Sequence, residues 1–307
     1  IPSFNELLEV LMRIALFGRS PKIQDLPYVE VVLEKLHEEG VAVGLYAPLK
    51  EACEQIRDEE FEELSFSIYH NEEELEAFDP DFLISLGGDG TILEATVLIR
   101  SKDIPILGIN MGRLGFLANV AKSNIETSID ALFSGRFQLD FRSLLQAKTS
   151  TNRVMKPNFA LNEITIARKE TTSMITVHTY LNGSYLNSYW ADGLIISTPT
   201  GSTGYSLSCG GPIIMPNSEN FVLTPIAPHN LTMRPFVISD NNTLRLKIES
   251  REHEFLASLD SRMHSFDSET ELLIQKADFR IALVQTEIQD FASTLRNKLS
   301  WGRDYRN

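Results

Sequence analysis

The chain reads FLISLGGDGT from Phe82 to Thr91, and this segment decides how the first part of the sequence is interpreted. Residues 82–86 are nearly all apolar, as expected of a parallel strand that helices cover on both faces. An amphipathic helical pattern follows directly. A strand that ends in glycines before a helix brings backbone amides and the positive helix end to a place where phosphate can bind. The sequence therefore predicts a phosphate-binding turn of Gly87, Gly88, Gly90 and Thr91.

Asp89 needs its own explanation, because a carboxylate inside a phosphate-binding turn would repel the phosphates. Two roles in phosphoryl transfer fit it: a ligand for Mg²⁺, or a general base that takes the proton of an attacking hydroxyl. The competing interpretation is an ordinary tight turn in which Asp89 or Thr91 only caps the next helix. The turn by itself leaves these alternatives open.

The sequence around this turn alternates short apolar runs with longer helical ones. Residues 14–18, 41–46 and 104–109 have the pattern of buried strands, and residues 28–39 repeat apolar side chains at helical spacing. This alternation predicts an α/β domain with a parallel sheet. Residues 1–11 fit either an extension or a short amphipathic helix.

Beyond Asn119 the pattern changes to short strand-like runs separated by polar, Gly, Pro or Asn turns. One helical stretch at residues 125–133 precedes them, and an amphipathic stretch at 291–299 follows them. We predict a mostly β second domain and a C-terminal helix that returns to the first domain. The predicted boundaries are 1–119 plus about 287–307 for the first domain and 120–286 for the second. Examples of the predicted strands are residues 161–167, 175–181, 194–197, 243–248, 254–259, 271–275 and 280–284.

The composition narrows the range of partners. A formal net charge of −14 argues against non-specific attraction to nucleic acid or to an anionic membrane surface. The two cysteines, Cys53 and Cys209, offer neither a disulfide framework nor metal-ligand spacing, which is consistent with a reducing compartment. No apolar run approaches the roughly 20 residues of a membrane span. We expect a cytoplasmic protein without nucleic-acid or membrane partners.

A second motif reads ADGLIISTPTGSTGYSLSCGGP from Ala191 to Pro212. Its small hydroxyl side chains provide compact hydrogen-bonding groups and its glycines allow close backbone approach, which suits a polar nucleotide ligand. An ordinary Ser/Thr/Gly loop is the alternative. A third pair, Asn162 and Glu163, can bind a ribose diol or a carboxamide, although a solvated strand edge explains an isolated pair more simply.

Taken together, in this order and spacing, the three motifs resemble the signature set of the NAD kinase family, in its bacterial form. The stretches INMGRLGFL at 109–117 and PIAPH at 225–229 extend the resemblance, which covers nearly everything from Met12 onward. The Gly-Gly-Asp-Gly turn alone is shared with diacylglycerol kinases, sphingosine kinases and phosphofructokinases. The other motifs are not.

The resemblance implies an ATP-dependent kinase that transfers the γ-phosphate to the 2′-hydroxyl of the adenosine ribose of NAD and gives NADP. It implies an active site between an α/β domain that binds the phosphate donor and a β domain that binds NAD. Mg²⁺ or another divalent cation would accompany ATP near Asp89, although no metal ligand is assigned. Similar enzymes are homo-oligomers, usually dimers or tetramers.

The resemblance also assigns roles to residues. Asp89 would be the base for the 2′-hydroxyl, and Gly90 would support the approach of the ligand. Asn162 and Glu163 would hold the nicotinamide-side ribose. The remaining residues expected along the dinucleotide are Asp192, Thr203, Gly204, Tyr205, Ser206, Leu207 and Ser208.

The chain departs from the family pattern in a few places. Gly204 and Cys209 replace common alanines, which should matter little because the side chains stay small. Arg262 stands in an Asp-Ser-Arg turn where the family commonly has Asp-Gly-Gln, so its role toward the ligand is open. His229 in its proline-rich turn is a possible ligand contact, with a structural histidine as the simpler interpretation. Arg113 is a further loop cation that could reach a phosphate, with an exposed loop arginine as the simpler interpretation.

Two alternatives to this function remain. A lipid kinase would need a membrane-seeking surface, and the net acidity without a basic amphipathic helix disfavours it. A non-catalytic NAD or NADP sensor is disfavoured by the intact Asp89. Neither a Walker sequence nor a Gly-x-Gly-x-x-Gly fingerprint occurs, which argues against a dehydrogenase.

Overall fold

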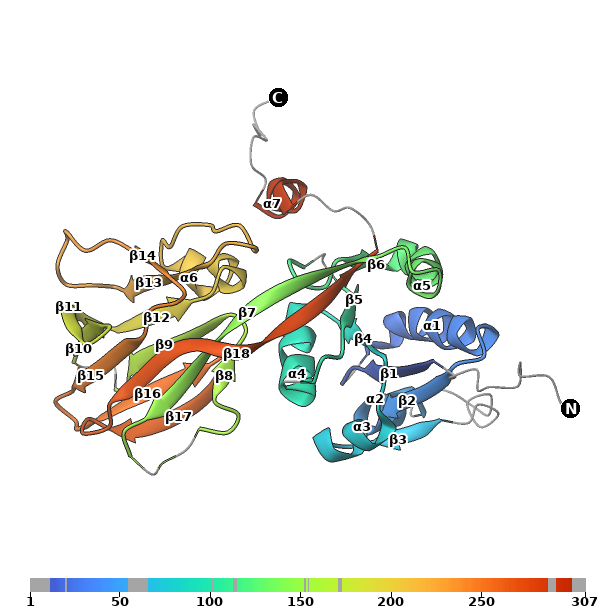
Figure 1. The fold of residues 1–307 in the computed structure, drawn as a ribbon, viewed down its shortest axis with the longest axis horizontal. Coiled ribbons are helices and arrows are strands. Elements are labelled where there is room, and N and C mark those ends of the chain that lie inside the picture. The colour runs from blue at the N-terminus through green and yellow to red at the C-terminus, as the bar shows by residue number, and fades with distance from the viewer. Residues whose placement is uncertain are drawn as a thin grey trace, which may run out of the picture. The chain divides into compact units, whose positions relative to one another are not determined.

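The computed structural model describes residues 12–19, 21–54, 66–100, 102–112, 115–151, 153, 155–170, 173–286 and 291–299. The predicted helix or extension at residues 1–11 lies outside the described residues, as does Arg113. The chain divides into two compact units, Ile1–Asp140 with Ile281–Asn307 and Phe141–Arg280 (Figure 1).

The first unit is built on a parallel sheet with the strand order β18-β5-β4-β1-β2-β3. Four of its strands, β1, β2, β4 and β5, are short and mostly apolar and buried, as the sequence pattern predicted. A two-residue strand, β6, pairs with the end of β5, and β18 pairs with the start of β5. The bounds are β1 Arg13–Phe17, β2 Ala42–Tyr46, β3 Ser67–Tyr69, β4 Phe82–Gly87, β5 Ile106–Asn110, β6 Val120–Ala121 and β18 Leu272–Gln285.

Helices connect these strands and bury their apolar faces against the sheet. Figure 1 shows α1 and α5 next to each other, and their side chains share one core with β1 and β5. The helix α4 starts immediately after β4, so the glycine turn lies at the carboxyl end of a central strand. The bounds are α1 Leu26–Glu38, α2 Ala47–Glu54, α3 Glu72–Phe78, α4 Asp89–Ile99, α5 Ile125–Phe133 and α7 Phe291–Leu299.

The second unit contains strands from two sheets whose pairs in this unit are antiparallel. A six-stranded sheet has the order β14-β13-β12-β9-β16-β17, and the facing strands have the order β11-β10-β15-β18 with β7 and β8 beside them. The bounds are β7 Gln138–Thr149, β8 Phe159–Ala160, β9 Glu163–Arg168, β10 Ile175–Leu181, β11 Ser184–Ala191, β12 Gly193–Ser197, β13 Asn220–Ile226, β14 Phe236–Ser239, β15 Leu244–Glu249, β16 Glu254–Leu259 and β17 Arg262–Asp267.

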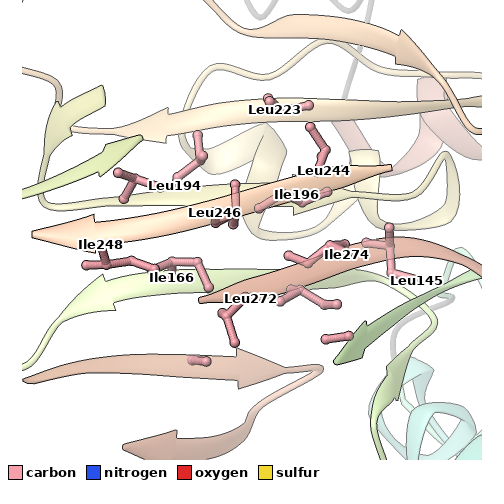
Figure 2. Close-up of a cluster of buried hydrophobic side chains, with 14 of the residues drawn as sticks. Leu145, Ile166, Leu194, Ile196, Leu223, Leu244, Leu246, Ile248, Leu272 and Ile274 are labelled. Atoms are coloured by element: carbon pink, nitrogen blue, oxygen red, sulfur yellow. The ribbon is translucent and has the colours of Figure 1, made fainter. Parts of the chain in front are cut away.

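The core of the second unit lies between these two layers. Figure 2 shows Ile196 and Leu223 from the six-stranded sheet in one cluster with Leu246 and Ile274 from the other layer. Along β15 the buried positions alternate with more exposed ones, because successive side chains of a strand point to opposite faces. This packing holds β9 and β12 in place. Asn162 and Glu163 lie at the start of β9, and the motif at 191–212 contains β12 and continues beyond it.

The predicted fold class is confirmed: an α/β unit with a parallel sheet, a mostly β unit and a C-terminal helix in the first unit. The predicted helices at 125–133 and 291–299 match α5 and α7, and the predicted strands at 175–181 and 254–259 match β10 and β16. One prediction was wrong. The runs 271–275 and 280–284 belong to one continuous strand, β18, because the residues between them stay in extended conformation.

The limits of the compact units differ from the boundaries placed on the sequence. The units change at Asp140 and Ile281, so α5 packs with the first unit, whereas the sequence boundary followed the change of pattern at Asn119. The division into a donor-binding and an NAD-binding domain stays a prediction.

Candidate functional site

The glycine turn joins the end of β4 to the first residue of α4 and leaves two of its glycines open. A Cβ added at Gly87 would lie 2.0 Å from Thr91 Oγ1, so this position has no room for a side chain. Within the described part of the chain, a Cβ at Gly88 or Gly90 would meet nothing within 4 Å. Thr91 Oγ1 accepts a hydrogen bond of 3.3 Å from the Gly88 amide and so fixes the turn. The first turn of α4 therefore presents an accessible backbone and helix N-terminal amides suited to phosphate.

Asp89 is the first residue of α4, and its carboxylate is held by three backbone amides. The Phe116 amide donates to Oδ2 over 2.8 Å, and the amides of Leu117 and Ala118 each donate to Oδ1 over 3.0 Å. These donors lie in the segment that follows β5, so the side chain ties the turn to a second loop. A carboxylate has about four lone-pair sites, and these three bonds leave about one of them. The predicted alternative was that Asp89 or Thr91 only caps α4. Thr91 does bond to the backbone at the start of α4, whereas the Asp89 side chain bonds to another loop.

The residues around Asp89 supply no protein cage for a metal. Among the described residues, no group of three or more His, Cys, Asp or Glu side chains could hold a metal ion. With about one lone-pair site left, Asp89 could contribute at most one ligand. A Mg²⁺ ion held by Asp89 would therefore need further ligands besides these protein side chains.

In the second unit, the loop after β12 approaches the start of β9 very closely. A Cβ at Gly201 would lie 2.1 Å from the Asn162 carbonyl oxygen. Thr198 reinforces this contact, because its amide donates to the Asn162 carbonyl over 2.9 Å and its hydroxyl donates to the Leu161 carbonyl over 2.6 Å. The second and third sequence motifs, which are far apart along the chain, therefore lie together.

The hydroxyl groups of the second motif divide into two sets. Buried hydroxyls bond to the protein itself: Ser202 donates to the Pro199 carbonyl over 2.6 Å, and Ser206 bonds to Thr224 over 2.8 Å. These side chains shape the short helices η4 (Thr200–Thr203) and α6 (Tyr205–Ser208). Tyr205 and Ser208 are exposed, with Tyr205 45% accessible. The exposed set is the one free to contact a ligand.

Five of the predicted NAD-binding residues converge: Asn162, Glu163, Asp192, Gly204 and Tyr205. A Cβ at Gly204 would lie 3.2 Å from Glu163 Oε2 and 3.8 Å from Asn162 Nδ2. Burial raises the pKa of the Tyr205 phenol, with further contributions from Cys209 and from the Asp192 and Glu163 carboxylates. At Gly204, where the family commonly has alanine, the missing methyl group leaves room beside Glu163.

Glu163 is the most perturbed acid of this group. Burial, and then the charge of Asp260, raise its pKa to about 8. Its Oε2 atom is buried and has no hydrogen-bond partner within the described structure. A carboxyl group with unused hydrogen-bonding capacity beside an exposed tyrosine is suited to bind hydroxyl groups of a ligand.

Asp260 is a residue that the sequence analysis did not select. It lies in the tight turn between β16 and β17, where it has a φ of 45°. Its carboxylate accepts the backbone amides of Leu161, Asn162 and Glu163 at 2.6, 2.8 and 3.1 Å. Burial raises its pKa, and these three bonds and Arg262 act in the opposite direction. Asp260 thus fixes the backbone on which the third motif stands; its place in the Asp-Ser-Arg turn was the only sequence signal.

Arg262 turns inward instead of extending into solvent. Its guanidinium donates to the Phe159 carbonyl and lies 5.6 Å from the centre of the Phe159 ring. Burial lowers its pKa, which Asp260 partly offsets. Two of its nitrogen atoms, Nε and Nη1, are buried without a hydrogen-bond partner in the part of the chain described. Arg262 therefore contacts Phe159, and its charge acts on Asp260 and His264.

Two other predicted residues have protein partners. Asp192 forms an ion pair of 3.0 Å with Arg168, and the backbones of the two residues are also hydrogen-bonded. His229 is exposed, and its ring centre lies 4.1 Å from that of Trp190. The roles of Asp192 and His229 toward a ligand stay predictions.

Comparisons with known proteins identify the family of the chain. The family model described as the ATP-NAD kinase N-terminal domain matches residues 14–137, and the ATP-NAD kinase C-terminal domain matches residues 161–286. The chain is 44% identical to an NAD kinase of Cytophaga hutchinsonii over 96% of this chain and 100% of the relative. It is 56% identical to an NAD kinase of Flavobacterium psychrophilum over 74% of this chain and 78% of the relative.

Solved structures show the same fold. A yeast NADH kinase complexed with NADH has a TM-score of 0.84 and 24% identity, covering 96% of this chain and 89% of its own. An NAD kinase from Archaeoglobus fulgidus in complex with ATP has a TM-score of 0.71 and 27% identity, covering 94% and 98%. In the described part of the chain, none of the helices has the length and apolar character of a membrane span.

Proposed function

Because this chain belongs to the ATP-NAD kinase family, we propose that it transfers the γ-phosphate of ATP to the 2′-hydroxyl of the adenosine ribose of NAD. The observation that carries the proposal is the Asp89 carboxylate, held by three amides at the edge of a glycine turn whose backbone is open to a phosphate. The turn and the carboxylate together provide a phosphate site and a proton acceptor.

In the proposed reaction, ATP enters with Mg²⁺, and the open backbone at Gly88 and Gly90 binds the phosphates. Asp89 accepts the proton of the 2′-hydroxyl through its remaining lone pair. The hydroxyl oxygen forms a bond to the γ-phosphorus, the bond to the β-phosphate oxygen breaks, and ADP leaves. The three amide donors contribute by holding the carboxylate in one orientation, which lowers the entropic cost of the reaction.

We assign NAD binding to the group around Glu163 in the second unit. Asn162, Glu163 and Asp192 would bind ribose and carboxamide groups, and Tyr205 with its exposed ring would contact the dinucleotide. Gly204 supports this assignment because its Cα lies close to Glu163 and Asn162 and carries no side chain that would crowd them. Thr203, Leu207 and Ser208 would complete the surface.

The test is a direct assay. The purified chain is incubated with ATP, Mg²⁺ and NAD, and NADP is measured with a coupled dehydrogenase. Asp89→Asn is expected to lower turnover by about two orders of magnitude or more while NAD binding measured by calorimetry persists. Near-normal turnover in this variant would refute the base assignment.

The same assay separates the alternatives. Tight NAD binding without NADP formation by the wild type would favour a sensor, and phosphorylated diacylglycerol in a parallel reaction would favour a lipid kinase. We further propose a homo-oligomer, as the resemblance implies. Light scattering coupled to gel filtration tests this, and a monomeric mass at assay concentration would contradict it.

A further inference from the structure

The C-terminal helix α7 brings a cation to the carboxylate of the glycine turn. Lys298 Nζ lies 3.7 Å from Asp89 Oδ2, and it lies 4.4 Å from the centre of the Phe116 ring. The Phe291 ring, at the start of α7, lies 6.1 Å from the Phe116 ring. All four residues belong to the first compact unit. Two separate contacts therefore fix α7 against the loop that donates its amides to Asp89.

Lys298 lies beside Oδ2 of Asp89, the same oxygen that accepts the hydrogen bond from the Phe116 amide. Oδ2 of Asp89 accepts one amide bond, whereas Oδ1 accepts two. The remaining lone-pair site of the carboxylate is consequently on Oδ2, beside Lys298. A cation at this distance attracts the carboxylate and so supports the orientation that the three amides give it.

We propose that Lys298 is a positioning residue for phosphoryl transfer, which orients the Oδ2 atom of Asp89 and offsets its negative charge beside the incoming phosphates. The proposal rests on the function proposed above. Without Lys298, Asp89 keeps its amide bonds, but its charge faces the phosphates uncompensated. Loss of Lys298 should therefore lower turnover and not NAD binding, since NAD is assigned to residues of the second unit.

A merely stabilising role for Lys298 would have a different signature. The two side chains are 28% and 31% exposed, and ion pairs of such partly exposed groups contribute little to stability. Removing the charge should therefore leave the melting temperature nearly unchanged. A loss of turnover without a loss of stability would then report on the reaction itself.

The experiment compares Lys298→Met, which keeps the apolar stem, with Lys298→Arg, which keeps the charge. Lys50→Met is the matched control, because Lys50 pairs with Glu54 on α2 of the same unit. We expect Lys298→Met to lower kcat by about tenfold to a hundredfold, with the KM for NAD changed by less than about twofold. Lys298→Arg should restore most of kcat, and Lys50→Met should match the wild type. Equal kcat values for Lys298→Met and Lys50→Met would overturn the inference.

A double-mutant cycle tests whether Lys298 acts through Asp89. In the Asp89→Asn background, Lys298→Met should change kcat by less than about twofold, because the residue it positions is already altered. A full, independent loss in that background would overturn the inference. If Lys298→Met melts well below the wild type, kcat is compared between Lys298→Gln and Lys298→Arg instead. A low kcat in Lys298→Gln with a nearly normal kcat in Lys298→Arg supports the positioning role. An equally low kcat in both variants refutes it.

The activity of the wild type distinguishes failure of the Lys298 inference from failure of the proposed function. A wild type that forms NADP while Lys298→Met is unimpaired refutes only the role of Lys298. A wild type that forms no NADP overturns the proposed function and this inference with it.

Discussion

The carboxylate of Asp89 occupies the space that a side chain at Gly115 would need. A Cβ built at Gly115 would lie 1.7 Å from Asp89 Oδ1 and 2.5 Å from its Cγ. The glycine is therefore required by contact with a residue far earlier in the chain, and the three amides that follow it can reach the carboxylate only because of this close approach.

Gly115→Ala should displace Asp89 and break part of its amide network. We expect kcat/KM for NAD phosphorylation to fall about a hundredfold or more, since small displacements of reacting groups have effects of this size. Gly112→Ala is the matched control after the same strand, because among the described residues its Cβ would meet only Asn110 Oδ1, at 3.9 Å. Similar activities of the two variants would show that the position of Asp89 does not limit the reaction.

Gly87 and Gly90 should respond to alanine in opposite ways. Gly87→Ala creates a clash with Thr91 and is expected to destabilise the protein by about 1–3 kcal/mol. Gly90→Ala has free space and should leave stability unchanged or slightly raised. If phosphates approach this backbone, however, the added methyl group should raise the KM for ATP about tenfold or more. Thermal melts and ATP saturation curves measure both effects, and a normal KM for ATP in Gly90→Ala would argue against a phosphate site at this turn.

Glu163 should make the stability of the chain depend on pH. Its pKa is raised from the ordinary value of 4.5 to about 8, so the folded chain holds this proton more tightly than the unfolded chain. The stabilisation is complete below about pH 4.5 and is lost as the pH rises toward 8. Glu163→Gln should remove most of this slope in urea unfolding between about pH 5 and pH 8.

A control for this titration is Glu254→Gln, because Glu254 lies nearer the surface and pairs with Lys169. The slope in the control should equal that of the wild type. An unchanged slope in Glu163→Gln would contradict the raised pKa. If the ribose hydroxyls of NAD bind the charged Glu163 carboxylate, added NAD should weaken the pH dependence of stability, because hydrogen bonds to the charged form favour that form.

Asp89→Asn needs a stability measurement beside its activity. Asparagine offers one oxygen where aspartate offers two, so its NH₂ group would face one of the backbone donors. An unsatisfied buried donor costs about 1–3 kcal/mol. A melting curve therefore separates loss of the base from loosening of residues 116–118: large loss of turnover with a small drop in the free energy of unfolding supports the base.

Local patterns in the sequence were enough for the fold class and for the position of the first motif. Alternating apolar runs predicted the strands and helices, and a glycine run between a buried strand and a helix lies at the end of that strand. For this reason Gly87 to Thr91 could be assigned to the edge of the sheet from the sequence. The resemblance, not the local pattern, attached a nucleotide to that edge.

Tertiary structure alone decided what surrounds Asp89 and Glu163. The amides of residues 116–118, Lys298 near the other end of the chain, and Asp260 beside the Asn162 backbone are distant in sequence from the motifs they support. Such contacts depend on strand order and on the register between strands, which a local pattern does not contain. The sequence therefore determined that an acid stands in a phosphate-binding turn, whereas only the fold decided how that acid is oriented, by which amides and beside which cation.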